Sequence, residues 1–525
     1  MNHNFDIAVI GSGFAGSLMA MIVRRLGYSA VLLERGKHPR FAIGESSTPL
    51  ANLSLEELAR RYDLPRLLPL TKWGSWQREH PEIVVGLKRG FTFYHHRFGK
   101  PFAADPERRD QLLVGASPHA EIADTHWYRA DFDAFLVREA QRFGVEYLDQ
   151  TRLTSASTEA DGVTLEGTRP GQTVSLRARF VIDASGPRGF LHRALRLPEV
   201  AFEDFPSTQA LYTHFTGVKR LDQMEPFCSS EAPPYPVDDA AVHHVFDGGW
   251  VWGLRFNNGV TSAGIAATDK LANELCFAEG APAWKRLLQR LPTLHEQFAD
   301  AGAGFPFVHA PGLSFRTGQV AGPHWALLPS AAGFVDPLLS TGFPLTLLGI
   351  NRLAQILENG LDSTRSEKRL MDYSRQTLKE LDSTAQLVAA LYATMDDFPL
   401  FAALSLLYFA AASFTETARR LNKAQLAGDT FLLVDHPEFG GHARTCCDAA
   451  LDLKRRNGVT DAEKEQIVER IYRTIASVDV AGLSKRERRN WHPVNAADLF
   501  EAAPKLQSNA SEIEKMLERC GFRMR

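Results

Sequence analysis

The chain has 525 residues, of which 44% are hydrophobic and 23% are charged, and its formal net charge is −3. Such values are typical of a globular protein with two or three structural units, and the near-neutral charge makes nucleic acid an unexpected partner. The five cysteines lack the spacing of a metal site, and their odd number favours a reducing, cytoplasmic location. The first residues lead directly into a predicted strand, so no secretory signal is expected.

A complete strand–turn–helix–strand unit occupies the start of the chain. The apolar run Asp6–Ile10 predicts a strand buried on both faces, and it leads into the glycine-rich turn Gly11–Gly16. A helix over Ser17–Leu26 follows, and a second apolar strand, Ser29–Leu33, ends at Glu34. Because glycines, helix, second strand and acid all stand in order, the unit predicts a dinucleotide-binding fold of the Rossmann type.

Each residue of this unit has a physical role. Gly11 permits the tight turn, Gly13 lets a pyrophosphate approach the backbone, and Gly16 lets helix and strand pack closely. Ala15 belongs to the same turn, and Glu34 is expected to accept hydrogen bonds from the ribose of an adenosine. The unit therefore predicts a dinucleotide, either FAD or a nicotinamide.

A loop over Phe41–Pro49 follows the second strand on the cofactor side. Its residues Glu45–Thr48, Ser47 among them, are expected to cover the cofactor, whereas a plain surface loop is the alternative. Further on, Arg129 stands before a helix predicted over Asp131–Phe143. There it could meet a phosphate or an acid beside the cofactor, or lie on the surface.

Pro81–Tyr94 has the pattern of a strand, a turn and a second strand, with Lys88 at the end of an apolar run. From the pattern alone, a lysine in a strand is usually an exposed edge residue. Lys72 is a competing lysine, in surroundings that look less like a strand. Neither His95-His96 nor His243-His244 suits a chelating pair, since neighbours on a strand point to opposite faces, and no metal site is predicted.

Later segments predict a further strand of the first sheet and a separate antiparallel region. The strand that ends at Asp183 is expected to rejoin the first sheet and to place Gly186 near the cofactor. Ala241–Ala267 predicts two consecutive hairpins, in which Trp250 and Trp252 share one face. Two such tryptophans are usually core residues, but they would also suit a wall between two chambers.

Trp325–Ile350 predicts a buried strand, an irregular turn and a helix. Asp336 in the turn is placed to bind a ribityl hydroxyl. The helix start at Thr341, Gly342 and Phe343 offers free N–H groups to a small anion. A cofactor segment so far from the amino terminus favours FAD over a short nicotinamide domain.

Beyond this segment the pattern is helical and is expected to close a substrate cavity. The apolar window 398–414 is short for a membrane span and favours a buried helix. The predicted fold is α/β: a Rossmann-type FAD-binding domain interleaved with an antiparallel-sheet substrate domain, plus a helical C-terminal region. The predicted boundaries are 1–80, 128–200 and 315–365 for the first, 81–127 and 201–314 for the second, and 366–525 for the third.

Together these segments resemble the flavin-dependent halogenases, within the p-hydroxybenzoate-hydroxylase-like flavoproteins. The resemblance spans residue 5 to about residue 412. Its carriers are GSGFAG at Gly11–Gly16, GESSTP at Gly44–Pro49, KRGFTF at Lys88–Phe93, YRADFDAFL at Tyr128–Leu136, VIDASG at Val181–Gly186, GWVWGLR at Gly249–Arg255 and GFVDPLLSTG at Gly333–Gly342. The lysine in a K-x-G-x-x-F strand and the tryptophan pair are the most discriminating of these.

The resemblance implies that FADH2 from a separate reductase reacts with O2 to a C4a-hydroperoxyflavin. A chloride or bromide near Thr341 and Gly342 would then give hypohalous acid. Lys88 would hold this species by hydrogen bonding, or form a haloamine, beside an electron-rich aromatic substrate that is free or bound to a carrier protein. Under the same resemblance Phe343 lies at the cofactor.

Two differences from the family pattern bear on the substrate and the chemistry. WVWGLR carries Leu254 and Arg255 where the family signature has Ile-Pro, and Leu339 stands where tryptophan halogenases carry a glutamate. The second difference favours a phenol, pyrrole or indole over free tryptophan. An FAD-dependent monooxygenase, a geranylgeranyl-reductase-like flavin reductase and a non-catalytic flavin-binding protein are the alternatives.

Overall fold

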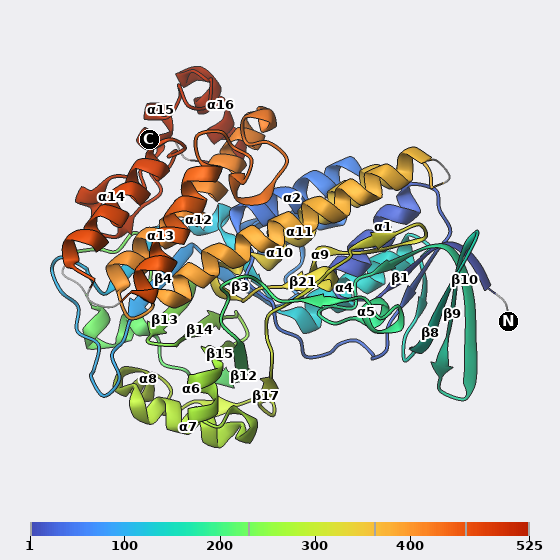
Figure 1. Ribbon diagram of the computed structural model, residues 1–525, viewed down its shortest axis with the longest axis horizontal. Coiled ribbons are helices and arrows are strands. Elements are labelled where there is room, and N and C mark those ends of the chain that lie inside the picture. The colour runs from blue at the N-terminus through green and yellow to red at the C-terminus, as the bar shows by residue number, and fades with distance from the viewer. Residues whose placement is uncertain (1–2, 229–230, 362–363, 457–458, 523–525) are drawn as a thin grey trace.

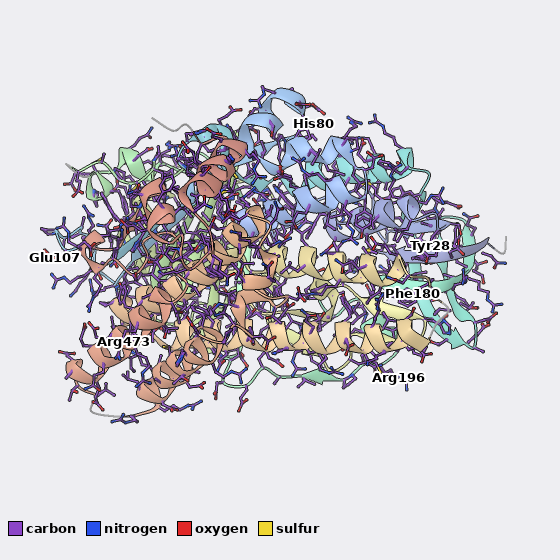
Figure 2. All side chains as sticks on the ribbon, turned by 90° about the horizontal axis from the view of Figure 1, so that it is seen from above. Tyr28, His80, Glu107, Phe180, Arg196 and Arg473 are labelled. Carbon is purple, nitrogen blue, oxygen red and sulfur yellow. The ribbon has the colours of Figure 1, made fainter. Side chains whose placement is uncertain are left out.

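The computed structural model describes residues 3–228, 231–361, 364–456 and 459–522. Two sheets lie side by side, and a layer of long helices runs across them (Figure 1). The amino terminus lies at the end of the long axis that carries the first sheet, and the carboxyl terminus lies among the helices at the opposite end (Figure 1). From above, Tyr28 and Phe180 mark the first end, whereas Glu107 and Arg473 mark the second (Figure 2).

The first sheet has the strand order β19-β20-β10-β1-β2-β7, with β9 and β8 as an antiparallel extension of β10. Its strands are β1 (His3–Ile10), β2 (Ala30–Leu33), β7 (Glu146–Leu148), β8 (Arg152–Glu159), β9 (Gly162–Arg169), β10 (Gln172–Asp183), β19 (Ala321–Gly322) and β20 (Trp325–Leu327). Strand β1 is parallel to both β2 and β10, so the carboxyl ends of these strands meet at one edge. The predicted cofactor acids Glu34 and Asp183 both lie at that edge.

Helices cover this sheet because their apolar residues fall on its faces. They are α1 (Phe14–Arg25), α4 (Arg129–Arg142), α5 (Phe190–Ala194) and α9 (Pro329–Ala332), and α10 (Gly342–Leu357) packs on α1 and α9. Helix α2 (Pro49–Arg61) packs on α10, and α3 (Trp73–Glu79) packs on the separate strand Val85–Lys88. Ten consecutive residues of α1 are buried, and Gly13 is its N-cap. Helix α4 begins at Arg129, two residues before the predicted start.

The second sheet has the order β16-β12-β15-β14-β13-β4-β5-β22, and β17 pairs with β12. Its strands are β4 (Gly90–His95), β5 (Gln111–Gly115), β12 (Thr208–Thr216), β13 (Ala241–Phe246), β14 (Gly249–Arg255), β15 (Thr261–Thr268), β16 (Gly302–Ala303), β17 (Val308–Ala310) and β22 (Trp491–His492). The register of β13, β14 and β15 confirms the two predicted hairpins. Helices α6 (Asp269–Glu274), α7 (Ala281–Arg290) and α8 (Pro292–Gln297) pack on this sheet around their own apolar core.

Two small sheets complete the strands. The pair β3 (Val85–Lys88) and β6 (Asp124–Trp127) is antiparallel, and β18 (Phe315–Thr317) joins β11 (Glu199–Val200) to β21 (Gly333–Phe334). Both predicted strands of Pro81–Tyr94 are present, but they do not form a hairpin: β3 pairs with β6, whereas β4 pairs with β5 and β13. The single residue between β3 and β4 lets the chain cross from one sheet to another.

The carboxyl-terminal region is helical, as predicted, except for β22. Its helices are α11 (Thr364–Ala393), α12 (Phe398–Arg420), α13 (Gly440–Arg455), α14 (Asp461–Ala476), α15 (Ala496–Glu501) and α16 (Ala510–Cys520). Among the described residues, α12 is one helix long and apolar enough to span a membrane, but 83% of its most apolar window is buried inside the protein. That burial favours a core helix, as the sequence predicted. The residue limits of the three units stay a prediction.

Candidate active site

The glycine-rich turn before α1 lies beside two arginines and the acids that pair with them. Gly11 has a φ of 95°, and a Cβ on Gly16 would lie 1.8 Å from the Gly11 carbonyl oxygen. A Cβ on Gly13 would instead meet Arg129 Nη2 at 3.3 Å, Asp133 Oδ2 at 3.8 Å and Arg40 Nη2 at 3.9 Å, all of them side-chain atoms. At Gly13 the turn thus borders side chains rather than backbone, and the two guanidinium groups and the start of α1 fit a pyrophosphate.

Glu34 closes the adenosine side of the same turn. Its carboxylate is buried and accepts hydrogen bonds from Ser12 N and Oγ and from Gly36 N. Burial acts to raise the pKa of Glu34, but these hydrogen bonds and the charge of Arg40 lower it overall. Nearby, His38 Nδ1 and Arg40 Nε are buried with no hydrogen-bond partner among the described residues. Two unpaired polar atoms beside the acid that the sequence predicts to bind a ribose fit an adenosine half, so these residues suit FAD.

Arg129 ties the loop over residues 41–49 to α4. Its guanidinium forms a buried ion pair with Asp133 at 2.8 Å and donates to the carbonyls of Ile43 and Gly44. Ser47 Oγ donates to the Thr125 carbonyl, which fastens the loop to β6. The sequence left open whether Arg129 meets a phosphate or an acid; in the structure it pairs with the acid Asp133, beside the glycine-rich turn.

The end of β10 is shaped by Asp183. This fully buried carboxylate accepts hydrogen bonds from Ser185 N and Oγ and from Leu191 N. Burial raises its pKa, and those hydrogen bonds oppose the rise. An added Cβ at Gly186 would meet no atom within 4 Å. Asp183 thus supports the loop that follows β10, and Gly186 in that loop borders open space.

Asp336 is held by a buried network that the sequence did not reveal. Trp250 Nε1 and Leu338 N donate to Oδ1 at 3.2 and 2.9 Å, and the Tyr392 hydroxyl donates to Oδ2 at 2.9 Å. Burial raises the pKa of Asp336 to about 7, against the effect of the three donors. Tyr392 lies 56 residues away on α11, and no local signal marks it.

We expect Tyr392→Phe to destabilise the protein by about 1–3 kcal/mol, because Asp336 Oδ2 loses its donor. The loss should be larger at pH 8 than at pH 5. A carboxyl whose folded-state pKa is raised above its unfolded value loses stability as pH rises, and removing the tyrosine raises that pKa further. Urea unfolding at both pH values measures the difference.

Tyr373→Phe is the matched control for this experiment. Tyr373 is also buried, but its hydroxyl donates to the backbone carbonyl of Leu327, which does not titrate. Its loss should therefore be the same at both pH values. An equal loss at both pH values for Tyr392→Phe would show that Asp336 is not the coupled group.

The start of α10 lies in the turn that follows Asp336. Leu339 and Ser340 have φ values of 63° and 56°, so the backbone bends sharply before Thr341. Thr341 is buried, whereas a Cβ on Gly342 would meet no atom within 4 Å. Phe343 stacks on Trp127 with ring centroids 4.3 Å apart. The predicted anion position thus combines a helix start with open space at Gly342.

An aromatic wall runs from the Asp336 network towards Lys88. Trp250 lies 5.8 Å from Trp252 and 5.2 Å from the His243 ring, between ring centroids. His243 in turn stacks on Phe93 at 4.3 Å and on Phe91 at 6.0 Å. Both tryptophans are buried core residues, which is the alternative that the sequence left open, and together with these rings they form a continuous layer.

Lys88 lies at the end of this wall and is fully buried. The expectation of an exposed edge lysine is therefore wrong, because β3 is covered by the loop over residues 41–49 and by the second sheet. Its Nζ donates to Ser46 Oγ at 2.8 Å and to the Ser47 carbonyl at 2.5 Å, and lies 3.7 Å from the centroid of Phe91. Burial lowers the pKa of Lys88, and the charge of Asp124 opposes this shift.

A large cavity, which holds about 1350 Å³ when the solvent in its open mouth is counted, has Phe91 but not Lys88 in its wall. Its walls come from the start of α2, the strands β4, β5 and β6, helix α12 and the C-terminal segments around β22 and α16. Tyr408 and Phe409 supply aromatic surface, and the competing lysine, Lys72, lies at this wall too. Closure of the cavity by the carboxyl-terminal region agrees with the sequence-based expectation.

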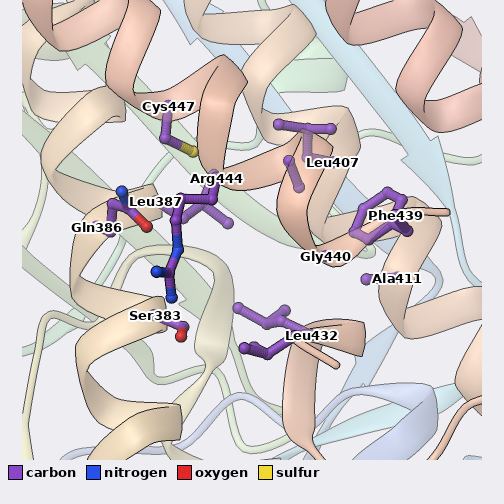
Figure 3. A pocket seen from close by; sticks show the side chains of 12 residues that line it. Ser383, Gln386, Leu387, Leu407, Ala411, Leu432, Phe439, Gly440, Arg444 and Cys447 are labelled. Carbon is purple, nitrogen blue, oxygen red and sulfur yellow. The ribbon is translucent and has the colours of Figure 1, made fainter. Parts of the chain in front are cut away.

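A second hollow lies between α11, α12 and α13 (Figure 3). Leu387, Leu407, Leu432 and Phe439 line it, and Arg444 reaches across it towards Ser383 (Figure 3). None of the predicted site residues borders this hollow. The described residues also contain no group of three or more His, Cys, Asp or Glu side chains that could hold a metal ion.

The structure therefore gathers the predicted residues into two neighbouring groups. One group surrounds the nucleotide turn and the Asp336 network, and the other surrounds Lys88 and the large cavity. The sequence did not identify Asp124, which lies opposite Lys88, nor His214, whose Nε2 lies 2.8 Å from Glu45 Oε1. Asp124 stands just before the recognisable YRADF stretch, which was the one available signal.

Comparison with known proteins agrees with this arrangement. Residues 120–405 match the model of the tryptophan halogenase family. The monodechloroaminopyrrolnitrin halogenase PrnC of Pseudomonas fluorescens is 29% identical over 85% of this chain and 78% of its own length. The tetracycline 7-halogenase of Kitasatospora aureofaciens is 31% identical over 67% of this chain and 62% of its own length.

A solved structure and a further relative are also halogenases. The crystal structure of the halogenase PltM in complex with phloroglucinol and FAD is 25% identical and superimposes with a TM-score of 0.83, covering 92% of this chain and 99% of PltM. A further relative, from Pseudomonas fluorescens strain ATCC BAA-477, is named a 1H-pyrrole-2-carbonyl-[peptidyl-carrier protein] chlorinase and is 25% identical over 66% of this chain and 74% of its own length.

Proposed function

The chain belongs to the tryptophan halogenase family and is a flavin-dependent halogenase that uses FAD, and we propose that it halogenates an electron-rich aromatic substrate through Lys88. The observation that carries this proposal is the buried amine behind Phe91. Its Nζ is held by Ser46 and Ser47 from the loop over residues 41–49, and Phe91 also forms the wall of the large cavity.

The roles of the residues divide between the two groups. Gly11, Gly13, Ala15, Gly16 and Glu34 hold the adenosine and pyrophosphate of FAD, while Ser47, Arg129, Asp183, Gly186, Asp336 and Phe343 shape its other half. The halide binds at the backbone of Thr341 and Gly342. Bound FAD, delivered in reduced form by a separate reductase, supplies hypohalous acid from O2 and the halide.

Lys88 then presents the halogen to the substrate. As an ammonium it donates a hydrogen bond to hypohalous acid, and as an amine it forms a haloamine. Trp250 and Trp252 belong to the wall that keeps the substrate away from FAD. Burial of the lysine keeps bulk water from hydrolysing a haloamine and keeps hypohalous acid from escaping into solution.

The substrate is a phenol, pyrrole or indole rather than free tryptophan. Leu339 is fully buried where tryptophan halogenases carry a glutamate, so that position offers no carboxylate to a substrate amine. A relative named for a carrier-bound pyrrole supports a carrier-bound substrate as one form. The unpaired cysteines support a cytoplasmic location.

A product screen tests the proposed function. The protein is mixed with chemically reduced FAD, O2 and chloride or bromide. The panel comprises phloroglucinol, resorcinol, indole, tryptophan and pyrrole-2-carboxylate, the last both free and on a peptidyl carrier protein. We expect halide-dependent halogenated products from at least one panel member other than tryptophan, detected by mass spectrometry.

The same screen separates the alternatives. A monooxygenase gives hydroxylated products and a flavin reductase gives saturated ones, in both cases without a carbon–halogen bond. A flavin-binding protein without turnover gives no product while it still binds FAD. Each of these results would contradict the proposed function.

A further inference from the structure

Asp124 is a buried acid directly opposite Lys88. The two residues pair in register across the antiparallel strands β3 and β6, so their side chains share one face. Asn52 Nδ2 donates to Asp124 Oδ1 at 2.8 Å, whereas Oδ2 has no hydrogen-bond partner among the described residues. The residue is 6% exposed and lines the large cavity. Asp124 thus stands in the cavity wall with one buried, unpartnered carboxylate oxygen, on the strand face that it shares with Lys88.

The other acids of this cavity are already paired with arginines. Glu416 accepts a hydrogen bond from Arg420 Nε at 2.6 Å, and Glu56 pairs with Arg60 at 2.8 Å. Asp124 has no ion pair within 4 Å among the described residues. An arginine-bound carboxylate is a poor base, because its charge is stabilised, whereas a buried carboxylate without such a partner is a stronger one.

The charged and titratable groups around the pair come from several elements. Glu416 and Arg420 on α12 act on Asp124, and His126 on β6 and His243 on β13 face Lys88. Burial and the lysine charge lower the pKa of both histidines, to about 3 for His243, so both stay neutral. Of these groups, Asp124 is therefore the one that can exchange a proton with Lys88.

We propose that Asp124 is the base that removes the ring proton of the substrate during halogenation and then returns it to Lys88. This inference rests on the proposed function.

The atoms and charges balance over one turnover. The substrate carbon attacks the halogen of hypohalous acid held by the Lys88 ammonium; the carbon–halogen bond forms, and the oxygen–halogen electron pair goes to oxygen. That oxygen takes a proton from Lys88 and leaves as water. The Asp124 carboxylate accepts the ring proton, whose bonding electrons restore aromaticity, and passes it to the neutral lysine. The net reaction converts ArH and HOX to ArX and water.

The test compares wild type with Asp124→Asn, which keeps the shape and the contact from Asn52. The substrate is the panel member that is halogenated, with protium or deuterium at the reacting carbon. Wild type should halogenate the protium and the deuterium substrate at equal rates, because loss of the ring proton is fast, and so does not limit the rate, when a base is in place. The variant should lose about 10³-fold in kcat, the usual contribution of a general base, with KM almost unchanged, and should turn over the deuterated substrate more slowly.

The wild type alone provides a second measurement, which does not depend on how the variant folds. Protonation of Asp124 at low pH should produce the same isotope effect that the variant shows at all pH values. In the variant the pKa of Lys88 should fall, because the carboxylate that raises it is gone. The high-pH limb of the kcat profile should therefore move to lower pH.

Asp238→Asn is the matched control, since Asp238 is another buried acid, held by Arg255 away from the cavity. The Asp238→Asn variant should halogenate the protium and the deuterium substrate at equal rates. Equal rates for both isotopes in Asp124→Asn and in wild type at low pH would overturn the role of Asp124 while leaving the proposed function intact. A wild type that halogenates no panel member would overturn both.

Discussion

Lys88→Met is expected to lower the kcat of halogenation by at least about 10²-fold while FAD binding is retained. Methionine fills the same buried space but has no nitrogen to hold the halogen. Removal of one preorganised donor costs about 10²- to 10³-fold in kcat, and loss of a haloamine would cost more. Because burial already raises the pKa of Asp124, this carboxyl can take up a proton when the lysine charge is gone, so the variant should fold. Halogenated product per unit of bound FAD is the measurement.

Lys72→Met is the control for this experiment. Lys72 lies at the same cavity, but it is partly exposed and donates to the Cys520 carbonyl at 3.2 Å. We expect most of the activity to remain. If Lys72→Met were inactive and Lys88→Met active, the relay would belong to Lys72. If both variants kept full activity, no lysine would carry the halogen.

Gly16→Ala is expected to destabilise the protein by about 3 kcal/mol and to abolish FAD binding. The new Cβ would lie 1.8 Å from the Gly11 carbonyl oxygen and 3.1 Å from the Ala184 Cβ, so backbone must move. Overpacking of a rigid contact typically costs 1–3 kcal/mol and occasionally more. Thermal unfolding without FAD, together with FAD titration by fluorescence, measures both effects.

Gly13→Ala separates the role of the turn in binding from its role in folding. The nearest atom to its Cβ is Arg129 Nη2 at 3.3 Å, and a side chain can yield. We expect nearly normal stability without FAD but weaker FAD binding, because the methyl group occupies the approach of the pyrophosphate. Wild-type FAD affinity in this variant would place the phosphate elsewhere.

The nucleotide-binding half could be predicted because its signal is local. Gly11, Gly13, Gly16 and Glu34 fall within one strand–turn–helix–strand unit, where turn geometry and helix packing restrict each position. The two hairpins of β13, β14 and β15 were equally local, since short turns determine the register of neighbouring strands. The apolar window 398–414, short for a membrane span, likewise predicted a buried helix; the helix α12 is longer than this window, and its burial supports the prediction.

The environment of Lys88 could not be predicted in the same way. A lysine at the end of an apolar run has the same pattern whether its strand lies at an edge or under a loop. Here β3 pairs with β6 instead of β4, and the loop over residues 41–49 supplies the partners of the amine. Both features depend on contacts between segments far apart in the chain.

The dinucleotide-binding α/β fold and the family could be derived from the amino-acid sequence, because both are marked by short motifs with restricted local geometry. The folded structure was needed to show that Lys88 is buried opposite Asp124, that Tyr392 holds Asp336, and that the strand β22 joins the helices that close the cavity. The physical reason is that burial, unlike turn geometry, is a property of what packs over a residue, and for Lys88, Asp124 and Asp336 burial shifts the pKa values on which the chemistry depends.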